Sequence, residues 1–287
     1  MIELFEQEIN TIDRQSSKGN QLKWKKNNTW YKADFTGYEG LSECVISLLL
    51  LHTNLNKNEF VIYNPVEIKY KSKKYNGVGS LDFLHDGWQI ITLERLFQSY
   101  YGESLNKAIW SIKEPKERLA FLVNNVKKIT GLEDFGKYMN KILTIDAFFL
   151  NEDRHTHNIA VLMNEQGQFD YCPIFDNGAG LLADTTMDYP LDGDVYKLID
   201  SVKGKTFSFS LEEQLDVSEI LYGMNIIFNF TKNDVEYIFS NMKLTSMYSE
   251  EICERVKMIV FEQMRKYPYL FKWGIINYEK NSIYMCS

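Results

Sequence analysis

The stretch Asn151-Glu152-Asp153-Arg154-His155-Thr156-His157-Asn158 lies near the middle of this 287-residue chain, and Phe175-Asp176-Asn177-Gly178 follows it. An aspartate, an asparagine five positions later and a second aspartate beside a glycine form the spacing of a phosphotransfer site. In such sites the first acid accepts a hydroxyl proton, and the other two side chains hold Mg²⁺ against ATP phosphates. We therefore predict Asp153 as a catalytic base and Asn158 and Asp176 as metal ligands.

The segment between these two motifs is typical of a β-hairpin. Residues 159–163 form an apolar strand pattern, residues 164–167 a polar turn, and residues 169–175 a returning strand. Strands paired in a hairpin lie about 5 Å apart, so this turn would bring Asn158 and Asp176 to the same end. Two oxygen ligands placed there would make a clamp for Mg²⁺.

Composition limits the class of protein. The hydrophobic content of 45%, charged content of 25% and net charge of −7 indicate a globular chain without the basic surface of a general nucleic-acid binder. The four cysteines show no CxxC spacing, so we expect neither a zinc site nor a disulfide framework, and a cytoplasmic location is the default. Residues 1–6 do not resemble a signal peptide, although secretion as an effector without such a signal stays open. The longest apolar run, residues 44–51, is far shorter than the ~20 residues that cross a bilayer.

The order of the predicted elements indicates an α+β fold with two lobes. Strands are predicted at 21–24, 29–34, 59–70, 74–83 and 88–92, with one helix at 40–55. Further helices are predicted at 93–101, 115–130, 132–150, 211–224, 231–242 and 249–267. We therefore expect a small β-rich lobe over 1–90, with the phosphate loop, a lysine strand and one helix. A larger helical lobe over 91–287 would hold the catalytic loop and the hairpin.

A kinase site also needs a cation on the ATP phosphates, usually a strand lysine fixed by a helix glutamate. Lys32 lies on the predicted second strand and Glu43 on the following helix, which makes them candidates for this pair. Read alone, Lys32 is better interpreted as a surface lysine of an alternating strand, and Glu43 has the same alternative as a solvated helix residue. The polar turn 15–20 lies just before the first strand, and backbone amides in such a turn can wrap phosphate oxygens. It matches neither the Walker pattern nor GxGxxG.

With these parts assembled, the chain resembles the HipA-like serine/threonine kinases, and among them the short single-subunit members of the cell-translocating kinase A type. The string of Asn151, Asp153, His155 and Asn158 is similar to that family's catalytic loop, and its DRHxxN form also resembles the phosphatidylinositol 3/4-kinases. Residues 37–43 resemble the family's helix entry, with Glu43 as the lysine partner. The resemblance covers most of residues 14–270, and its specific part is residues 146–180.

The resemblance implies a bilobal protein-kinase-like fold and an ATP- and Mg²⁺-dependent kinase. Its substrate would be a protein carrying serine or threonine, with the chain itself among the candidates, and a small antitoxin would be a partner. Lys32 would contact phosphate, and residues 77–84, including Asp82, would form the hinge beside adenine. The implied phosphate loop adds the ATP-binding candidates Ser17, Lys18 and Gly19, and the autophosphorylation candidates Ser16 and Ser17. A phosphate there would bring about −2 charge next to ATP and eject the loop.

Two positions depart from the family pattern. His157 stands where many HipA-type loops have a lysine, and a histidine there would change its charge near neutral pH while contacting ATP. Asn177 follows Asp176 where other kinases have an aromatic residue, which removes an aromatic switch. His155 either orders the loop or takes part in catalysis, and residues 178–194 are either an activation segment or an exposed loop.

Three alternatives remain at this point. His155 and His157 beside Asp153 would also suit a transition metal. The same site would serve a lipid or small-molecule kinase, although no basic membrane-facing cluster is evident. A non-catalytic nucleotide-binding regulator of a toxin–antitoxin pair is the alternative from a different class.

Overall fold

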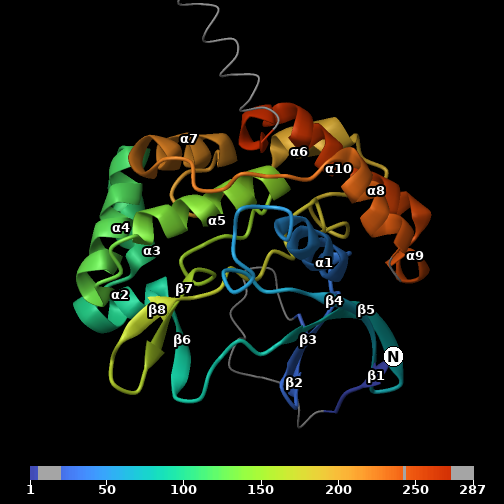
Figure 1. Cartoon of the computed structure of the whole chain (residues 1–287), viewed down its shortest axis with the longest axis horizontal. Coiled ribbons are helices and arrows are strands. Elements are labelled where there is room, and N and C mark those ends of the chain that lie inside the picture. The colour runs from blue at the N-terminus through green and yellow to red at the C-terminus, as the bar shows by residue number, and fades with distance from the viewer. Residues whose placement is uncertain (6–20, 242–243, 273–287) are drawn as a thin grey trace, which may run out of the picture.

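The computed structural model describes residues 1–5, 21–241 and 244–272 (Figure 1). Its larger sheet has the strand order β1-β4-β5-β3-β2, in which β1 runs parallel to β4 and the other neighbours are antiparallel. The strands are β1 (Ile2–Glu3), β2 (Lys23–Lys26), β3 (Thr29–Ala33), β4 (Asn64–Tyr70) and β5 (Lys73–Leu81). The predicted strands at 21–24, 29–34, 59–70 and 74–83 correspond to β2 to β5, with shifted ends.

Strand alternation decides which side chains of this sheet reach the rest of the molecule. Trp24, Ile68 and Tyr70 are buried together on one face, in a small core of their own. Successive strand side chains point to opposite faces, so Lys32 and its cross-strand partner Lys23 lie on the other face. The sequence pattern of β3 therefore places Lys32 under the sheet, on the side of the proposed site.

Helix α1 (Glu39–Leu50) packs against β3, β4 and β5, and nearly all its residues are buried. It ends five residues earlier than the predicted helix 40–55. The Thr53 hydroxyl donates a hydrogen bond to the Leu50 carbonyl at 2.7 Å, and Thr53 bridges to Phe228. The hydrogen bond gives a carbonyl group at the helix end a partner outside the helix. The bridge to Phe228 directs the chain away from the helix axis.

A second sheet has the order β6-β7-β8 and is entirely antiparallel. It comprises β6 (Trp88–Thr92), β7 (Ala160–Asn164) and β8 (Phe169–Tyr171). The predicted hairpin at 159–175 is thus present, but β8 stops well before residue 175. Pro173 has no N–H to donate, and Ile174 pairs instead with the segment around Phe60.

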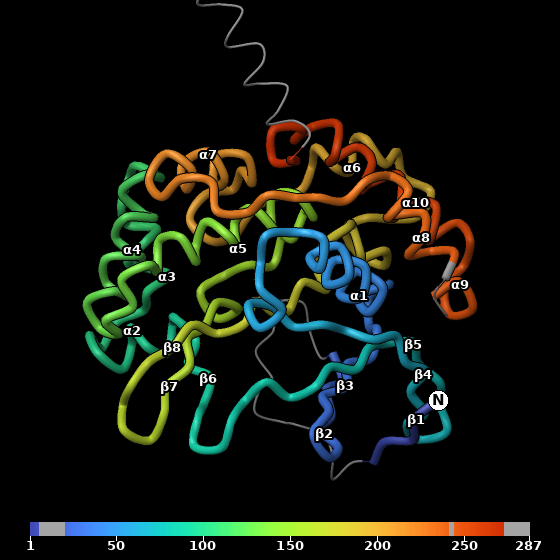
Figure 2. Tube along the Cα trace, in the orientation of Figure 1, coloured from blue at the N-terminus to red at the C-terminus, as the bar shows by residue number. Residues whose placement is uncertain are grey.

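The helices other than α1 lie mainly on the side of the molecule away from the larger sheet, while α2 contacts β6 of the second sheet (Figure 2). They are α2 (Leu93–Tyr101), α3 (Leu105–Ser111), α4 (Pro115–Thr130), α5 (Phe135–Phe149), α6 (Val195–Ser201), α7 (Leu211–Tyr222), α8 (Lys232–Asn241), α9 (Leu244–Met247), α10 (Glu250–Lys266) and a 3₁₀ turn at Pro268–Leu270. Helices α3, α6 and α9 were not predicted, because each is too short to show a helical repeat. Helix α5 is the most buried, and Phe148 on it packs among Phe228, Phe230 and Phe271.

This architecture confirms the predicted α+β class. Among the described helices, none combines the length and apolar character that a bilayer crossing requires. The turn 15–20 lies outside the described residues, and so do the candidates Ser16, Ser17, Lys18 and Gly19.

Candidate active site

The segment 151–158 begins where α5 ends. Leu150 has φ 58°, a left-handed conformation that stops the helix and reverses the chain. The Asn151 side chain then donates to the Asp146 carboxylate at 2.8 Å, and the Asn158 amide N–H donates to the His155 carbonyl at 2.8 Å. The motif is therefore a folded loop held against a buried helix.

Arg154 is the centre of this loop. Its side chain is buried and its Nε lies 3.0 Å from the Asp146 carboxylate. Its terminal nitrogens donate to the Phe175 carbonyl at 2.8 Å and to the Asn177 side chain at 2.6 Å. Burial alone would lower the pKa of Arg154, but the charge of Asp146 outweighs it and raises the pKa. One guanidinium thus joins α5, the loop and the end of the hairpin.

Asp153 follows the turn with its side chain mostly buried. The Asn158 Nδ2 donates to the Asp153 carbonyl at 2.8 Å and approaches its Oδ2 at 3.4 Å. Lys205 Nζ lies 3.0 Å from Oδ1. The carboxylate is consequently held from two sides, by its own loop and by a lysine from a distant segment.

Asp176 lies in the left-handed region with φ 62°, which is uncommon for a residue other than glycine. Lys32 Nζ is 2.7 Å from its Oδ1, and Lys23 Nζ is 3.9 Å from its Oδ2. Burial alone would raise the pKa of Asp176, but the charges of Lys23 and Lys32 outweigh it and hold the pKa well below its usual range. The carboxylate is therefore ionised.

Lys32 also lies 2.6 Å from the Glu43 carboxylate. The other Glu43 oxygen accepts the Asn177 amide at 3.1 Å. Burial would lower the pKa of Lys32, but Asp176 and Glu43 raise it well above its ordinary value. The structure thus brings together the two residues that the sequence suggested as a lysine–glutamate pair, and adds Asp176 to them.

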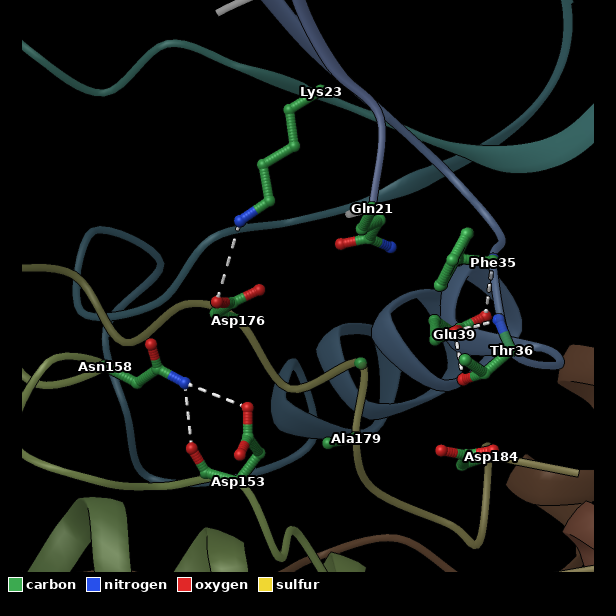
Figure 3. A pocket seen from close by; sticks show the side chains of 11 residues that line it. Gln21, Lys23, Phe35, Thr36, Glu39, Asp153, Asn158, Asp176, Ala179 and Asp184 are labelled. Atoms are coloured by element: carbon green, nitrogen blue, oxygen red, sulfur yellow. Dashed lines mark hydrogen bonds and ion pairs between the residues drawn. The ribbon is translucent and has the colours of Figure 1, made fainter. Parts of the chain in front are cut away.

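Asp153, Asn158 and Asp176 line one pocket with Lys23 and the α1 entrance (Figure 3). Because the Asn158 amide nitrogen faces Asp153, its oxygen is left on the side toward Asp176. An ionised carboxylate and an amide oxygen are suitable ligands for Mg²⁺, which takes its other ligands from phosphates and water. Among the described residues no group of three histidine, cysteine or acidic side chains is placed to hold a metal, so the transition-metal alternative gains no support.

Three further candidates, His155, His157 and Asp82, are not among the residues that line this pocket. His155 is half-buried, burial lowers its pKa, and its Nδ1 accepts the His157 amide at 3.2 Å, as expected of a residue that orders the loop. The His157 side chain is exposed, near Glu94. Asp82 forms an ion pair with Lys25 at 2.5 Å and lines a separate cavity.

Residues 178–194 pack closely against the α1 entrance. The Tyr38 amide donates to the Ala183 carbonyl at 3.1 Å, and Ser42 Oγ donates to the Gly180 carbonyl at 3.0 Å. A Cβ on Gly37 would come within 1.9 Å of the Ala183 oxygen, so only glycine permits this approach. This segment therefore fixes the helix that holds Glu43.

Sequence reasoning missed three parts of the site: Arg154, Lys23 and Lys205. Arg154 was visible inside the motif, where it directly follows the two loop acids Glu152 and Asp153. Lys23 faces Lys32 across the predicted hairpin, so strand alternation could have found it. Lys205 lies in an irregular segment 52 positions from Asp153 and left no local signal.

The fold itself is similar to that of a solved kinase. The crystal structure of the Helicobacter pylori proinflammatory kinase CtkA is similar with a TM-score of 0.62 and 15% identity, over 92% of this chain and 95% of that chain. HipA of Shewanella oneidensis MR-1, solved with HipB and operator DNA, matches at a TM-score of 0.47 and 13% identity, over 83% of this chain and 58% of that one. No protein-family profile and no curated protein sequence matches the chain. The likeness to CtkA confirms the kinase-like fold.

Proposed function

We propose that this chain is an ATP- and Mg²⁺-dependent serine/threonine protein kinase of the HipA-like type. The observation that carries the proposal is the convergence of Asp153, Asn158 and Asp176 on one pocket, with Lys32 held between Asp176 and Glu43. The kinase-like fold supports it as well. A binder that had lost catalysis would not need the Asp153 carboxylate in this position.

In the proposed reaction the acceptor hydroxyl oxygen forms a bond to the γ-phosphorus of ATP. The bond from that phosphorus to the β–γ bridging oxygen breaks, and ADP leaves with the electron pair. The hydroxyl proton passes to the Asp153 carboxylate, which gives a phosphoester, ADP and a proton in total. Asp153 therefore orients the hydroxyl and accepts its proton.

The other residues of the proposed site compensate the negative charge of the ATP phosphates. Asn158 and Asp176 would hold Mg²⁺, which supplies electrostatic stabilisation of the phosphates when bound. Lys32 neutralises further phosphate charge, and Glu43 keeps it in place. Because the transition state of phosphoryl transfer is loose, this positioning and charge provide most of the acceleration.

The proposal includes the partners that the sequence resemblance implies. The acceptor is a serine or threonine of another protein or of the chain itself, with Ser16 and Ser17 as the autophosphorylation sites. A small antitoxin, a cytoplasmic location and the division into lobes at 1–90 and 91–287 belong to the same proposal.

Radiolabelled ATP and Mg²⁺ test it, with four acceptors side by side: the protein alone, casein, phosphatidylinositol vesicles and a sugar mixture. We expect label on protein, lost in Asp153→Ala while ATP still binds. Asp176→Ala should lose Mg²⁺-dependent nucleotide binding. Asp192→Ala, an exposed acid, is the matched control and should behave as wild type.

Each other outcome points elsewhere. Label on lipid or sugar alone would favour the small-molecule alternative. A thermal shift with ATP and Mg²⁺ but no transfer to any acceptor would favour a non-catalytic regulator. Full labelling in Asp153→Ala would exclude Asp153 as the base. Mass spectrometry of the purified protein would show whether Ser16 or Ser17 bears phosphate.

A further inference from the structure

The Asp153 carboxylate is contacted by a lysine that lies outside both sequence motifs. Lys205 Nζ is 3.0 Å from Asp153 Oδ1, and its side chain is 37% exposed while that of Asp153 is 10% exposed. The opposite oxygen, Oδ2, is the one that Asn158 approaches. The two contacts together fix both the position and the rotation of the carboxyl plane.

The segment that bears Lys205 is built onto the catalytic loop. Thr206 Oγ1 donates to the Arg154 carbonyl at 2.6 Å, directly beside the Lys205–Asp153 pair. The Gly204 amide donates to the Phe209 carbonyl at 3.0 Å, which closes a tight turn. Arg118 anchors the same turn by donating to the Phe207 carbonyl at 3.0 Å. Lys205 is therefore presented by a defined turn whose backbone is held at several points.

Neither histidine of the loop offers an equivalent charge. Burial lowers the pKa of His155, which disfavours the charged form of its ring. His157 is exposed and lies near Glu94 of α2. Lys205, in contrast, places its side-chain nitrogen in direct contact with the carboxylate.

We infer that Lys205 is the positioning residue for Asp153. This role rests on the proposed kinase function. Lys205 holds the carboxylate toward the acceptor hydroxyl and places a positive charge where charge moves during transfer. A general base must lie within hydrogen-bond reach of the acceptor hydroxyl. A cation beside it is consequently close to the transferring phosphoryl group, where preorganised charge is most effective.

The test compares Lys205→Met with Lys203→Met, an exposed lysine two positions away on the same segment. We expect kcat to fall about 10²-fold in Lys205→Met. The KM for ATP should stay close to that of the wild type, because Lys32 and Asp176 are untouched. Lys203→Met should keep both constants.

Two rescue measurements separate positioning from folding. Lys205→Arg retains the charge and should recover part of kcat, less than fully because its planar head differs from an ammonium. Added methylammonium should raise kcat of Lys205→Ala and leave Lys203→Ala unchanged. Thermal unfolding of each variant is measured in parallel.

The inference is overturned if Lys205→Met keeps the kcat of Lys203→Met. It is also overturned if kcat falls but neither arginine nor methylammonium restores any of it, since the lysine would then only support the fold. A wild-type protein that transfers no phosphate to any acceptor overturns the proposed function, and this inference with it.

Discussion

The two acids of the proposed site are held in different surroundings. Asp176 contacts Lys32, whose side chain is only 12% exposed and also bonds Glu43, whereas Asp153 contacts Lys205, which is 37% exposed. Removing one partner of a buried ion pair leaves an uncompensated charge and costs ~3–5 kcal/mol. A partly exposed pair contributes only about 0–1 kcal/mol. We therefore expect the Lys32 cluster to contribute to both the proposed function and stability, and the Lys205 pair to contribute to the proposed function with little effect on stability.

The difference follows from what each pair connects. Lys32 lies on β3, Glu43 on α1 and Asp176 after β8, so their contacts join three elements. Lys205 and Asp153 lie on two neighbouring loops that other bonds already join, such as Thr206 to Arg154. The loss of the Lys205 contact should leave these loops in place, whereas the loss of Lys32 removes the link between elements.

The largest effect is expected for Lys32→Met. Glu43 and Asp176 would then lie buried beside each other without the cation that compensates them. We expect the free energy of unfolding to fall by ~3–5 kcal/mol, together with near-complete loss of phosphate transfer. Denaturant unfolding and labelling with ATP measure the two effects on the same sample.

The control for this change is Lys74→Met, an exposed lysine of β5 in the same sheet. It should change the free energy of unfolding by no more than ~0.5 kcal/mol. Phosphate transfer should stay at the wild-type level. Unchanged stability in Lys32→Met would contradict the view that this cluster supports the fold.

Much of the fold was predictable from local patterns. The helices at 93–101 and 115–130 were predicted at their observed bounds from their helical spacing. In the structure Thr92 caps the first helix, Pro115 begins the second, and a glycine follows each. The pair of Lys32 and Glu43 was predicted from the order of strand and helix. The hairpin between Asn158 and Asp176 was predicted from apolar alternation and a polar turn.

The remaining features depend on tertiary contacts that no local pattern encodes. Strand β6 pairs with β7, which follows it by almost seventy positions, so its neighbour could not be read from adjacent residues. Asp176 joins Lys32 across 144 positions, and Lys205 meets Asp153 across 52. Short helices such as α6 exist because the packed segment around them fixes their backbone, not because of a repeat in sequence.

The connection between β3 and α1 gives a second prediction, on how stability depends on pH. Asp34 accepts the Gly40 amide at 2.6 Å and the Tyr248 hydroxyl at 2.8 Å. Burial and the nearby charge of Glu39 raise the pKa of Asp34 to about 7. Between its ordinary pKa and this value the folded protein holds a proton that the unfolded chain has released, so stability falls as pH rises across that window.

Asp34→Asn removes this titration and keeps a similar shape. As pH rises from about 4 to about 7, we expect the stability of Asp34→Asn to increase relative to that of the wild type, by a total on the order of 2–4 kcal/mol. Above about pH 7 the difference should stay constant. Urea unfolding at several pH values measures it, with the exposed Asp192→Asn as control. If the free energies of unfolding of Asp34→Asn and wild type differ by a constant amount between about pH 4 and about pH 7, the raised pKa of Asp34 is contradicted. Asp176 has the opposite effect on the pH dependence of stability. Because its pKa is lowered in the folded protein, its contribution is lost only as the pH falls below about 4.

The smallest effect is expected for the coupling between Asp153 and Lys205, and it is the sharpest test of the comparison. In a double-mutant cycle of Asp153→Ala and Lys205→Met, the interaction free energy for unfolding should be at most about 1 kcal/mol, because solvent screens the half-exposed lysine. The same cycle applied to Lys32 and Glu43 should give a larger coupling, since both side chains are buried. Urea unfolding of the two sets at one pH gives both numbers. Equal couplings would mean that the two halves of the site do not differ in the way their exposure implies.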